Sequence, residues 1–340
     1  MHRITKRVLL VFLIIGIVCA GSLFHMLQAN CVVREGVIRI PTGATFQTLL
    51  DSLDSGGKRI KHRPAFRRYA RHIGLDRSVK PGHYVLQKGM DVKEVARMFN
   101  LGLQTPINVV INNVRTPQQL AGKLATQIEA DSVSILQALT DSSIVAQSGF
   151  RSPLELFSIF IPNTYQFYWT VKPTDFIGRM QREYDRFWTE ERQKALEKTG
   201  LTRMEAITLA SIVYEETRKG DEMPTIAGVY MNRLRRGMPL QADPTVKYAT
   251  GDFSLRRILK KHLRIDSPYN TYRNKGLPPT PICMPSIQAI DAVLHYGHHN
   301  YLYFCAKEDF SGYHNFAASY SEHLRNARRY AAELNRRGIR

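Results

Sequence analysis

The sequence predicts an α+β protein in which an N-terminal transmembrane helix precedes a small repeated α/β unit and a mixed α+β domain. Three observations support this fold class. Residues 8–24 form an apolar run without a charged side chain. A strand-like segment, a turn and an amphipathic helix then follow one another twice, about 45 residues apart, which is typical of an internal repeat. Near the C-terminus, Tyr301–Ala306 and Tyr313–Ala317 predict a hairpin, and a capped basic helix follows it.

The N-terminal apolar run is close to the roughly 20 residues that an α-helix needs to cross a bilayer. Arg3, Lys6 and Arg7 precede it, and basic residues favour the cytoplasmic side of a membrane. We therefore expect a cytoplasmic tail at 1–7 and an anchor at 8–28 in the cytoplasmic (inner) membrane, with the rest of the chain outside the cytoplasm. A cleaved signal peptide is the alternative, but its apolar region is normally about 7–15 residues long.

The composition is strongly basic, with a net charge of +19 over 340 residues. Such an excess indicates an anionic partner or surface, such as nucleic acid, lipid headgroups or an acidic polymer. A solvated basic surface is the other interpretation. No RNP, zinc-finger or P-loop pattern occurs in the sequence, and an anchored chain outside the cytoplasm does not meet chromosomal DNA. We therefore expect no nucleic-acid partner.

The four cysteines show neither a Cys-x-x-Cys motif nor the Cys/His spacing of a zinc site, so we expect no metal. We also expect no cofactor, because soluble nucleotide cofactors are absent outside the cytoplasm. Cys283 and Cys305 could form a disulfide in that compartment. Two buried free thiols are the alternative that we favour.

The repeated unit spans residues 33–112. Its first copy has a strand at Val37–Pro41 and its second a strand at His83–Leu86, each followed by a turn and an apolar helix. A weaker third copy starts at Val109–Asn112, and Arg63–Ile73 is predicted to be a basic helix between the first two copies. Such units serve either as binding modules or as structural packing.

Residues 113–200 are expected to form a helical connecting region. Asp131–Ala146 is predicted to be helical, and Thr174 is expected to cap a long amphipathic helix. The aromatic segment Phe157–Trp169 is interpreted as a buried strand and turn. A ring-lined wall for a sugar is the alternative.

A helix over Thr202–Glu216 is the centre of the C-terminal half. It starts with the Thr-x-x-Glu pattern of a capping box, and apolar residues then recur at helical spacing. Glu216 extends this apolar stripe at the end of the helix. Glu215 lies on a different face with Thr208 and Ser211, which we expect to be polar.

The position of Glu216 predicts an unusual acid. A carboxylate on a core-facing stripe loses solvation in its charged form, so its pKa rises. Such an acid keeps its proton near neutral pH and can donate it to a substrate. The alternative is a frayed helix end at which Glu216 reaches water or pairs with an arginine.

Further helices and a long loop follow this helix. Pro224 and Gly237 mark the start and the end of one helix, and Asp243-Pro244 predicts the cap of another. Ser267–Pro285 contains five prolines and is predicted to be irregular, and a loop of this length inside a domain is usually functional.

Six segments resemble, in order and spacing, the motifs of the endolytic murein transglycosylases of the YceG-like family. They are ITLASIVYEET (207–217), AGVYMNRLRRGMPLQADPTVKYA (227–249), SPYNTY (267–272), GLPPTPI (276–282), YLYFCA (301–306) and GYHNF (312–316). The resemblance implies that residues 33–112 are LysM-like and that 201–340 form a catalytic domain.

The resemblance also assigns residue roles. The first motif of the family usually reads A-S-I-[VI]-E-K-E-T, and its catalytic acid directly precedes the threonine, which makes Glu216 the expected catalytic residue. Tyr214 and Glu215 stand where the family has Glu and Lys, and Asn163 stands where it has Asp in Pro-Asp-Thr-Tyr. The expected substrate-binding residues are Glu222, Gln241, Asp243, Asn270 and His314. For the first four, orienting Glu216 is an alternative role. For Asp243 a helix cap, and for His314 a structural hydrogen bond, are the alternatives.

The implied reaction is cleavage of the β-1,4 bond between N-acetylmuramic acid and N-acetylglucosamine in peptidoglycan. One carboxyl group protonates the leaving oxygen and then accepts the proton of the muramic acid C6 hydroxyl as that oxygen attacks C1. The product has a 1,6-anhydro end. Expected partners are nascent glycan strands, the membrane and, from the family alone, peptidoglycan synthases. A non-catalytic peptidoglycan-binding scaffold is the alternative function.

Overall fold

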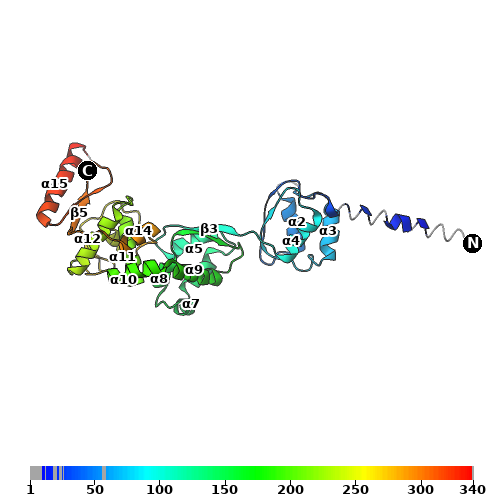
Figure 1. The fold of residues 1–340 in the computed structure, drawn as a ribbon, viewed down its shortest axis with the longest axis horizontal. Coiled ribbons are helices and arrows are strands. Elements are labelled where there is room, and N and C mark those ends of the chain that lie inside the picture. Colours follow the sequence, from blue (N-terminus) through cyan, green and yellow to red (C-terminus); the bar gives the residue numbers. More distant parts are fainter. Residues whose placement is uncertain are drawn as a thin grey trace, which may run out of the picture. The chain divides into compact units, whose positions relative to one another are not determined.

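The computed structural model describes residues 10, 11, 13–17, 21, 22, 25, 27–55 and 59–338 and contains both helices and small sheets (Figure 1). The coarse prediction of an α+β fold is confirmed. The chain divides into two compact units. The first contains residues 1–109, 125–130 and 165–172, and the second contains 110–124, 131–164 and 173–340.

The first unit is built from the strand–helix copies that the sequence predicts. Strands β1 (Gly36–Ile40) and β2 (Gly82–Leu86) pair antiparallel, with Gly36 opposite Leu86. Each is followed by a helix that starts with a capping box, α2 (Phe46–Asp54) and α4 (Val92–Leu101). The two copies therefore share one sheet and one core, to which Leu49, Leu53, Tyr84, Val95 and Phe99 belong.

The basic helix between the two copies is also present, as α3 (Arg63–His72). Phe66 and Ala70 are buried in the shared core, whereas Arg67 and Arg68 are exposed.

The predicted anchor at 8–28 falls partly outside the described residues, because 8, 9, 12, 18–20, 23, 24 and 26 are not among them. Among the residues that are described, no helix has the length and apolar character needed to cross a membrane.

Residues 107–199 contain a second two-stranded sheet, formed by β3 (Ile107–Ile111) and β4 (Asn163–Phe167). The helices of this region are α5 (Pro117–Ala125), α6 (Ser132–Thr140), α7 (Ser142–Gln147), α8 (Pro153–Leu156), the 3-10 turn η1 (Phe157–Ile159), α9 (Pro173–Phe187) and α10 (Glu190–Thr199).

Two helix predictions for this region need correction. The helix expected over Asp131–Ala146 is broken, because Asp141 takes an extended conformation and its carboxylate accepts the N–H groups of Ser143 and Ile144 at the start of α7. Thr174 does not cap the long helix. That helix begins at Pro173, since the fixed φ of proline suits the first helical position.

The aromatic segment 157–169 is divided between core and surface. Phe157–Ile161 are buried, and the ring of Phe160 stacks on Phe176 at 6.0 Å. Tyr168, in contrast, is exposed. The buried part of this segment is packed against protein, as the structural interpretation predicts.

Three helices form the centre of the second unit. The predicted capping box of Thr202 and Glu205 starts α11 (Arg203–Glu216), which packs against α12 (Met223–Arg235) and α14 (Ile287–Leu294) (Figure 1). Around them lie α13 (Asp243–Thr250), the 3-10 turn η2 (His262–Arg264), the hairpin of β5 (Tyr303–Ala306) and β6 (His314–Ala317), and α15 (Tyr320–Arg336).

Helix α11 is buried on nearly all sides. Residues 206–213 are all buried, so the face of Thr208 and Ser211, which was expected to be polar, lies in the core. The irregular segment 267–285 covers this face, because Ile282 donates its N–H to Ser211 Oγ at 3.0 Å. The face is polar in composition, as expected, but it is buried, since a hydroxyl group can be satisfied inside a core by backbone groups.

The structure also decides between two cysteine alternatives. Cys283 is buried, Cys305 is half-buried, and both are free thiols, as is Cys31. The favoured alternative is confirmed in that both thiols are free and no disulfide joins Cys283 to Cys305, but only Cys283 is buried as expected.

We predict that Ser211→Ala lowers the free energy of unfolding by about 1–3 kcal/mol, because the buried N–H of Ile282 loses its acceptor. Thr208→Val is the matched control on the same helix. The Thr208 hydroxyl is buried and has no hydrogen-bond partner within the described chain, so its replacement by a methyl group should be neutral or stabilising. Urea denaturation of both variants measures the difference. Equal losses in the two variants would contradict the role of Ser211.

Candidate active site

Glu216 is the last residue of α11, and its carboxylate is half-buried. It lines a cavity of about 460 Å³, within the usual size range of ligand sites. The phenol of Tyr230 donates a hydrogen bond of 2.7 Å to Glu216 Oε1. The cavity is lined by Glu215, Glu216, Asp243, Pro244, Lys247, Leu255, Arg256, Arg257 and Ile258.

The environment of Glu216 raises the pKa of its carboxyl group to about 7. Loss of solvation is the main cause, and the negative charge of Asp243 adds to it. The hydrogen bond from Tyr230 and the positive charge of Arg233 oppose the rise. Near neutral pH both protonation states of Glu216 are therefore populated, so one residue can give up a proton and take it back. The frayed helix end is the wrong alternative.

Tyr230 and Arg233 are two site residues that the sequence reasoning did not single out. Both lie on the buried face of α12, three residues apart. The guanidinium of Arg233 donates to the backbone oxygens of Leu302 at 2.6 Å and Leu240 at 2.8 Å, and no described carboxylate forms an ion pair with it. The sequence feature that could have identified them is a tyrosine and an arginine at helical spacing within a helix that is otherwise largely apolar.

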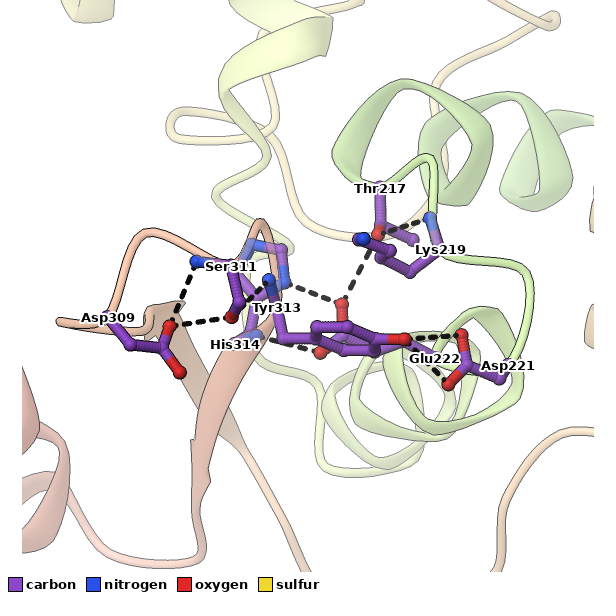
Figure 2. A network of polar contacts seen from close by, with 8 residues as sticks. All are labelled: Thr217, Lys219, Asp221, Glu222, Asp309, Ser311, Tyr313 and His314. Atoms are coloured by element: carbon purple, nitrogen blue, oxygen red, sulfur yellow. Dashed lines mark hydrogen bonds and ion pairs between the residues drawn. The ribbon is translucent and has the colours of Figure 1, made fainter.

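Glu222 and His314 form a network at the end of α11 (Figure 2). Glu222 is 6% exposed. Its carboxylate accepts the backbone N–H of His314 at 2.8 Å, the Nδ1–H of the same residue at 2.8 Å and the hydroxyl of Thr217 at 3.2 Å. Burial alone would raise the pKa of Glu222, but these hydrogen bonds outweigh it and lower the pKa. Glu222 therefore joins the β5–β6 hairpin to the segment that follows Glu216.

The hairpin loop has a second attachment to the same segment (Figure 2). The phenol of Tyr313 donates to both carboxylate oxygens of Asp221, at 3.1 and 3.3 Å. The ammonium group of Lys219 lies 4.8 Å from the centre of the Tyr313 ring. Neither Glu222 nor His314 lines the cavity of Glu216. Both therefore lie outside the lining of the cavity, whereas the sequence predicted ligand contacts for them.

Asp243 lines the cavity, as expected for a residue that contacts a ligand. It is the first residue of α13 and its side chain caps no helix, since the N-cap is Ala242. The cap alternative is therefore wrong. The carboxylate of Asp243 accepts the hydroxyl of Tyr272 at 2.7 Å. This bond connects the cavity to the irregular segment after η2.

Gln241 and Asn270, unlike Asp243, are not among the residues that line the cavity. Gln241 is exposed and adopts the left-handed region at φ 50°, and it donates its N–H to Thr271 O at 3.1 Å. Asn270 is completely buried. Its amide donates to the backbone oxygens of Leu263 and Ile265 and accepts the N–H of Tyr272. Asn270 therefore shapes the loop and offers no group to a ligand in this conformation.

Glu215 lines the cavity beside Glu216 but has a different partner. Arg115 donates to Glu215 Oε2 at 2.6 Å, and Oε1 is buried without a partner in the described chain. Tyr214 also departs from the family motif. Its ring lies 4.6 Å from the guanidinium of Arg218. Asn163 is exposed at the start of β4 and is not part of the cavity lining. Within the described residues, no group of His, Cys, Asp and Glu side chains comes together as a metal site would require.

Residues 38–329 match the YceG-like family. The endolytic murein transglycosylase of Bacillus subtilis strain 168 is 29% identical over 314 residues, which cover 88% of this chain and 85% of that protein. The endolytic murein transglycosylase of Streptococcus pneumoniae serotype 2 strain D39 is 30% identical over 320 residues, covering 85% of this chain and 57% of that protein. The crystal structure of a YceG-like protein from Listeria monocytogenes matches with a TM-score of 0.57 and 27% identity, over 86% of this chain and 98% of that chain.

We predict opposite changes in the pKa of Glu216 from two substitutions. Tyr230→Phe removes a hydrogen bond to the charged form and should raise this pKa further, whereas Asp243→Asn removes a repelling negative charge and should lower it. Carbon-13 NMR titration of the glutamate carboxyl groups measures both changes. Glu216→Gln serves to assign the signal. A shift in the same direction in both variants would contradict this account of the site.

Proposed function

The chain belongs to the YceG-like family, and on that premise we propose that it is an endolytic murein transglycosylase. The proposed substrate is a nascent peptidoglycan glycan strand, cut at the β-1,4 bond between N-acetylmuramic acid and N-acetylglucosamine. The proposed product is a strand that ends in 1,6-anhydro-N-acetylmuramic acid. The naming of the relatives from Bacillus subtilis and Streptococcus pneumoniae as endolytic murein transglycosylases supports this activity.

The observation that carries the proposal is the raised pKa of Glu216, about 7, at the edge of a ligand-sized cavity. Because the protonated form is populated at neutral pH, the carboxyl group can donate its proton to the glycosidic oxygen as the bond from C1 to that oxygen breaks. The resulting carboxylate then accepts the proton of the muramic acid C6 hydroxyl while its oxygen bonds to C1. The acid is regenerated and no water is consumed.

The hydrogen bond from Tyr230 suits this double role. It occupies Glu216 Oε1 and leaves the other carboxylate oxygen without a hydrogen bond in the described chain. That oxygen is available for the proton exchanged with the substrate. Ordinary glycosidases need a second carboxylate as nucleophile or base. Here an internal nucleophile held close to C1 replaces it.

The carboxylates beside Glu216 are engaged elsewhere. Glu215 forms an ion pair with Arg115, and Asp243 accepts the hydroxyl of Tyr272. This arrangement supports a reaction with a single acid. If Asp243 instead activated water, the protein would be a hydrolase, and its products would have reducing ends in place of 1,6-anhydro ends.

We also propose that residues 8–28 anchor the chain in the cytoplasmic membrane, with the rest of the chain outside the cytoplasm. The apolar run and its basic head support this location. Residues 33–112 are proposed to be a LysM-like region that binds glycan, on the basis of its two strand–helix copies. Association with peptidoglycan synthases is proposed from the family resemblance alone.

Digestion of purified peptidoglycan by the full chain in nonionic detergent tests the activity. Mass spectrometry should detect 1,6-anhydro ends, and Glu216→Gln should reduce their rate of formation about 10²–10⁴-fold, because it keeps the shape and removes the proton. Glu190→Gln, an exposed residue of α10, is the matched control. Reducing ends alone would indicate a hydrolase. Binding to peptidoglycan without cleavage would favour the scaffold.

The activity should depend on pH in a defined direction. The first step needs protonated Glu216, so kcat/KM should be highest below pH 7 and should fall as the pH rises through about 7. The rate of anhydro-end formation between pH 5.5 and 9 measures this dependence. A rate that stays constant over that range would exclude Glu216 as the proton donor.

A further inference from the structure

Three of the side chains that line the Glu216 cavity are cationic, and together they are called the cationic wall. Lys247 lies on α13, one turn after Asp243, and Arg256 and Arg257 lie in the irregular segment that follows the helix. Both arginines are exposed and Lys247 is half-buried. Leu255 and Ile258 flank the two arginines and line the same cavity, which gives this wall both charged and apolar groups.

The side chains of the three cations form no ion pair and no hydrogen bond within the described chain. The charge of Lys247 helps to lower the pKa of Asp252, whereas the two arginines have no such neighbour among the described acids.

The nearby acids are already engaged. Asp243 accepts the hydroxyl of Tyr272, Asp252 accepts the N–H and hydroxyl of Ser254 at 2.9 and 2.6 Å, and Glu215 pairs with Arg115. The cationic wall is therefore free to bind an anion from outside the chain.

The proposed substrate carries anions in only one place near the cleaved bond. The sugar rings are neutral, whereas each muramyl residue bears a peptide through its lactyl group, and this peptide has free carboxylates. Arginine binds carboxylates with two parallel hydrogen bonds. We propose that Lys247, Arg256 and Arg257 form a subsite for a carboxylate of the peptide on the muramyl residue at the cleavage site.

This proposal rests on the proposed function and adds a substrate requirement to it. Glu216 and the cationic wall line the same cavity, so the muramyl residue that reacts and the peptide that it bears would be bound together. The protein would then select glycan strands that still carry peptides and discriminate against strands from which the peptides have been removed.

The double substitution Arg256→Gln and Arg257→Gln tests the subsite, since glutamine keeps a polar side chain and removes the charge. We expect KM for peptide-bearing strands to rise about tenfold, with kcat changed less than twofold. The double substitution of Lys260 and Lys261 to Gln is the matched control. These residues also are exposed but do not line the cavity, and KM should stay within twofold of the wild-type value.

Modified substrates identify the group that the cations bind. Coupling the peptide carboxylates to methylamine makes them neutral, and wild-type KM should then rise about tenfold while the double arginine variant shows no further rise. Strands stripped by an amidase retain only the lactyl carboxylate, and wild-type KM for them should also rise. An arginine variant that loses affinity equally for charged and neutral strands would overturn the proposal. Undiminished wild-type affinity for stripped strands would assign the subsite to the lactyl group instead and overturn it too.

The two proposals can fail separately. If the wild type forms anhydro ends and the arginine variant keeps its KM, the subsite is wrong and the activity stands. If the wild type forms none, the proposed function is wrong. The subsite is then tested by equilibrium binding of peptide-bearing strands. The arginine variant should bind them about tenfold more weakly than the wild type.

Discussion

The partial burial of one carboxyl group at the end of α11 is the constraint on which the rest of the catalytic region depends. The pKa of Glu216 is set mainly by loss of solvation, so it would change if the helix end moved toward water. Helix α11 is held on nearly all sides, by α12, by α14 and by the segment bound to Ser211. A carboxyl group that loses solvation reduces stability, and α11 carries this cost, as is common for functional residues.

Glu216 and Glu222 show that burial alone does not determine the pKa of an acid. They lie six residues apart, and both lose solvation, which by itself raises the pKa of each. Glu216 receives one hydrogen bond, from Tyr230, and its pKa rises. Glu222 receives three, from Thr217 and from His314, and its pKa falls. The number of hydrogen-bond donors therefore separates an acid with a raised pKa from a nearby acid with a lowered pKa.

The sequence was informative where the determining interactions are local. The capping box of α11 and the helical phase of Glu216 involve residues within one or two turns, so they could be read without the fold. The burial of the polar face of α11 could not be read from the sequence, because the groups that cover Ser211 come from residues about 70 positions later. Asn270 was similarly expected to bind substrate from its motif, but the motif cannot tell a ligand contact from a loop contact. Tyr230 and Arg233 were missed because only the packing of α12 brings them to Glu216.

The departure from the family motif at Glu215 is compensated within this chain. Where the family has Lys, Glu215 adds a negative charge next to Glu216, and Arg115, 100 residues earlier in the sequence, neutralises it through a bond of 2.6 Å. Without Arg115 a second charged carboxylate would repel the deprotonated form of Glu216. With it, Glu216 is the acid of the cavity that combines loss of solvation with the lack of an ion pair. The pKa of Glu216, about 7, leaves both of its protonation states populated near neutral pH, as the proposed reaction with one acid requires.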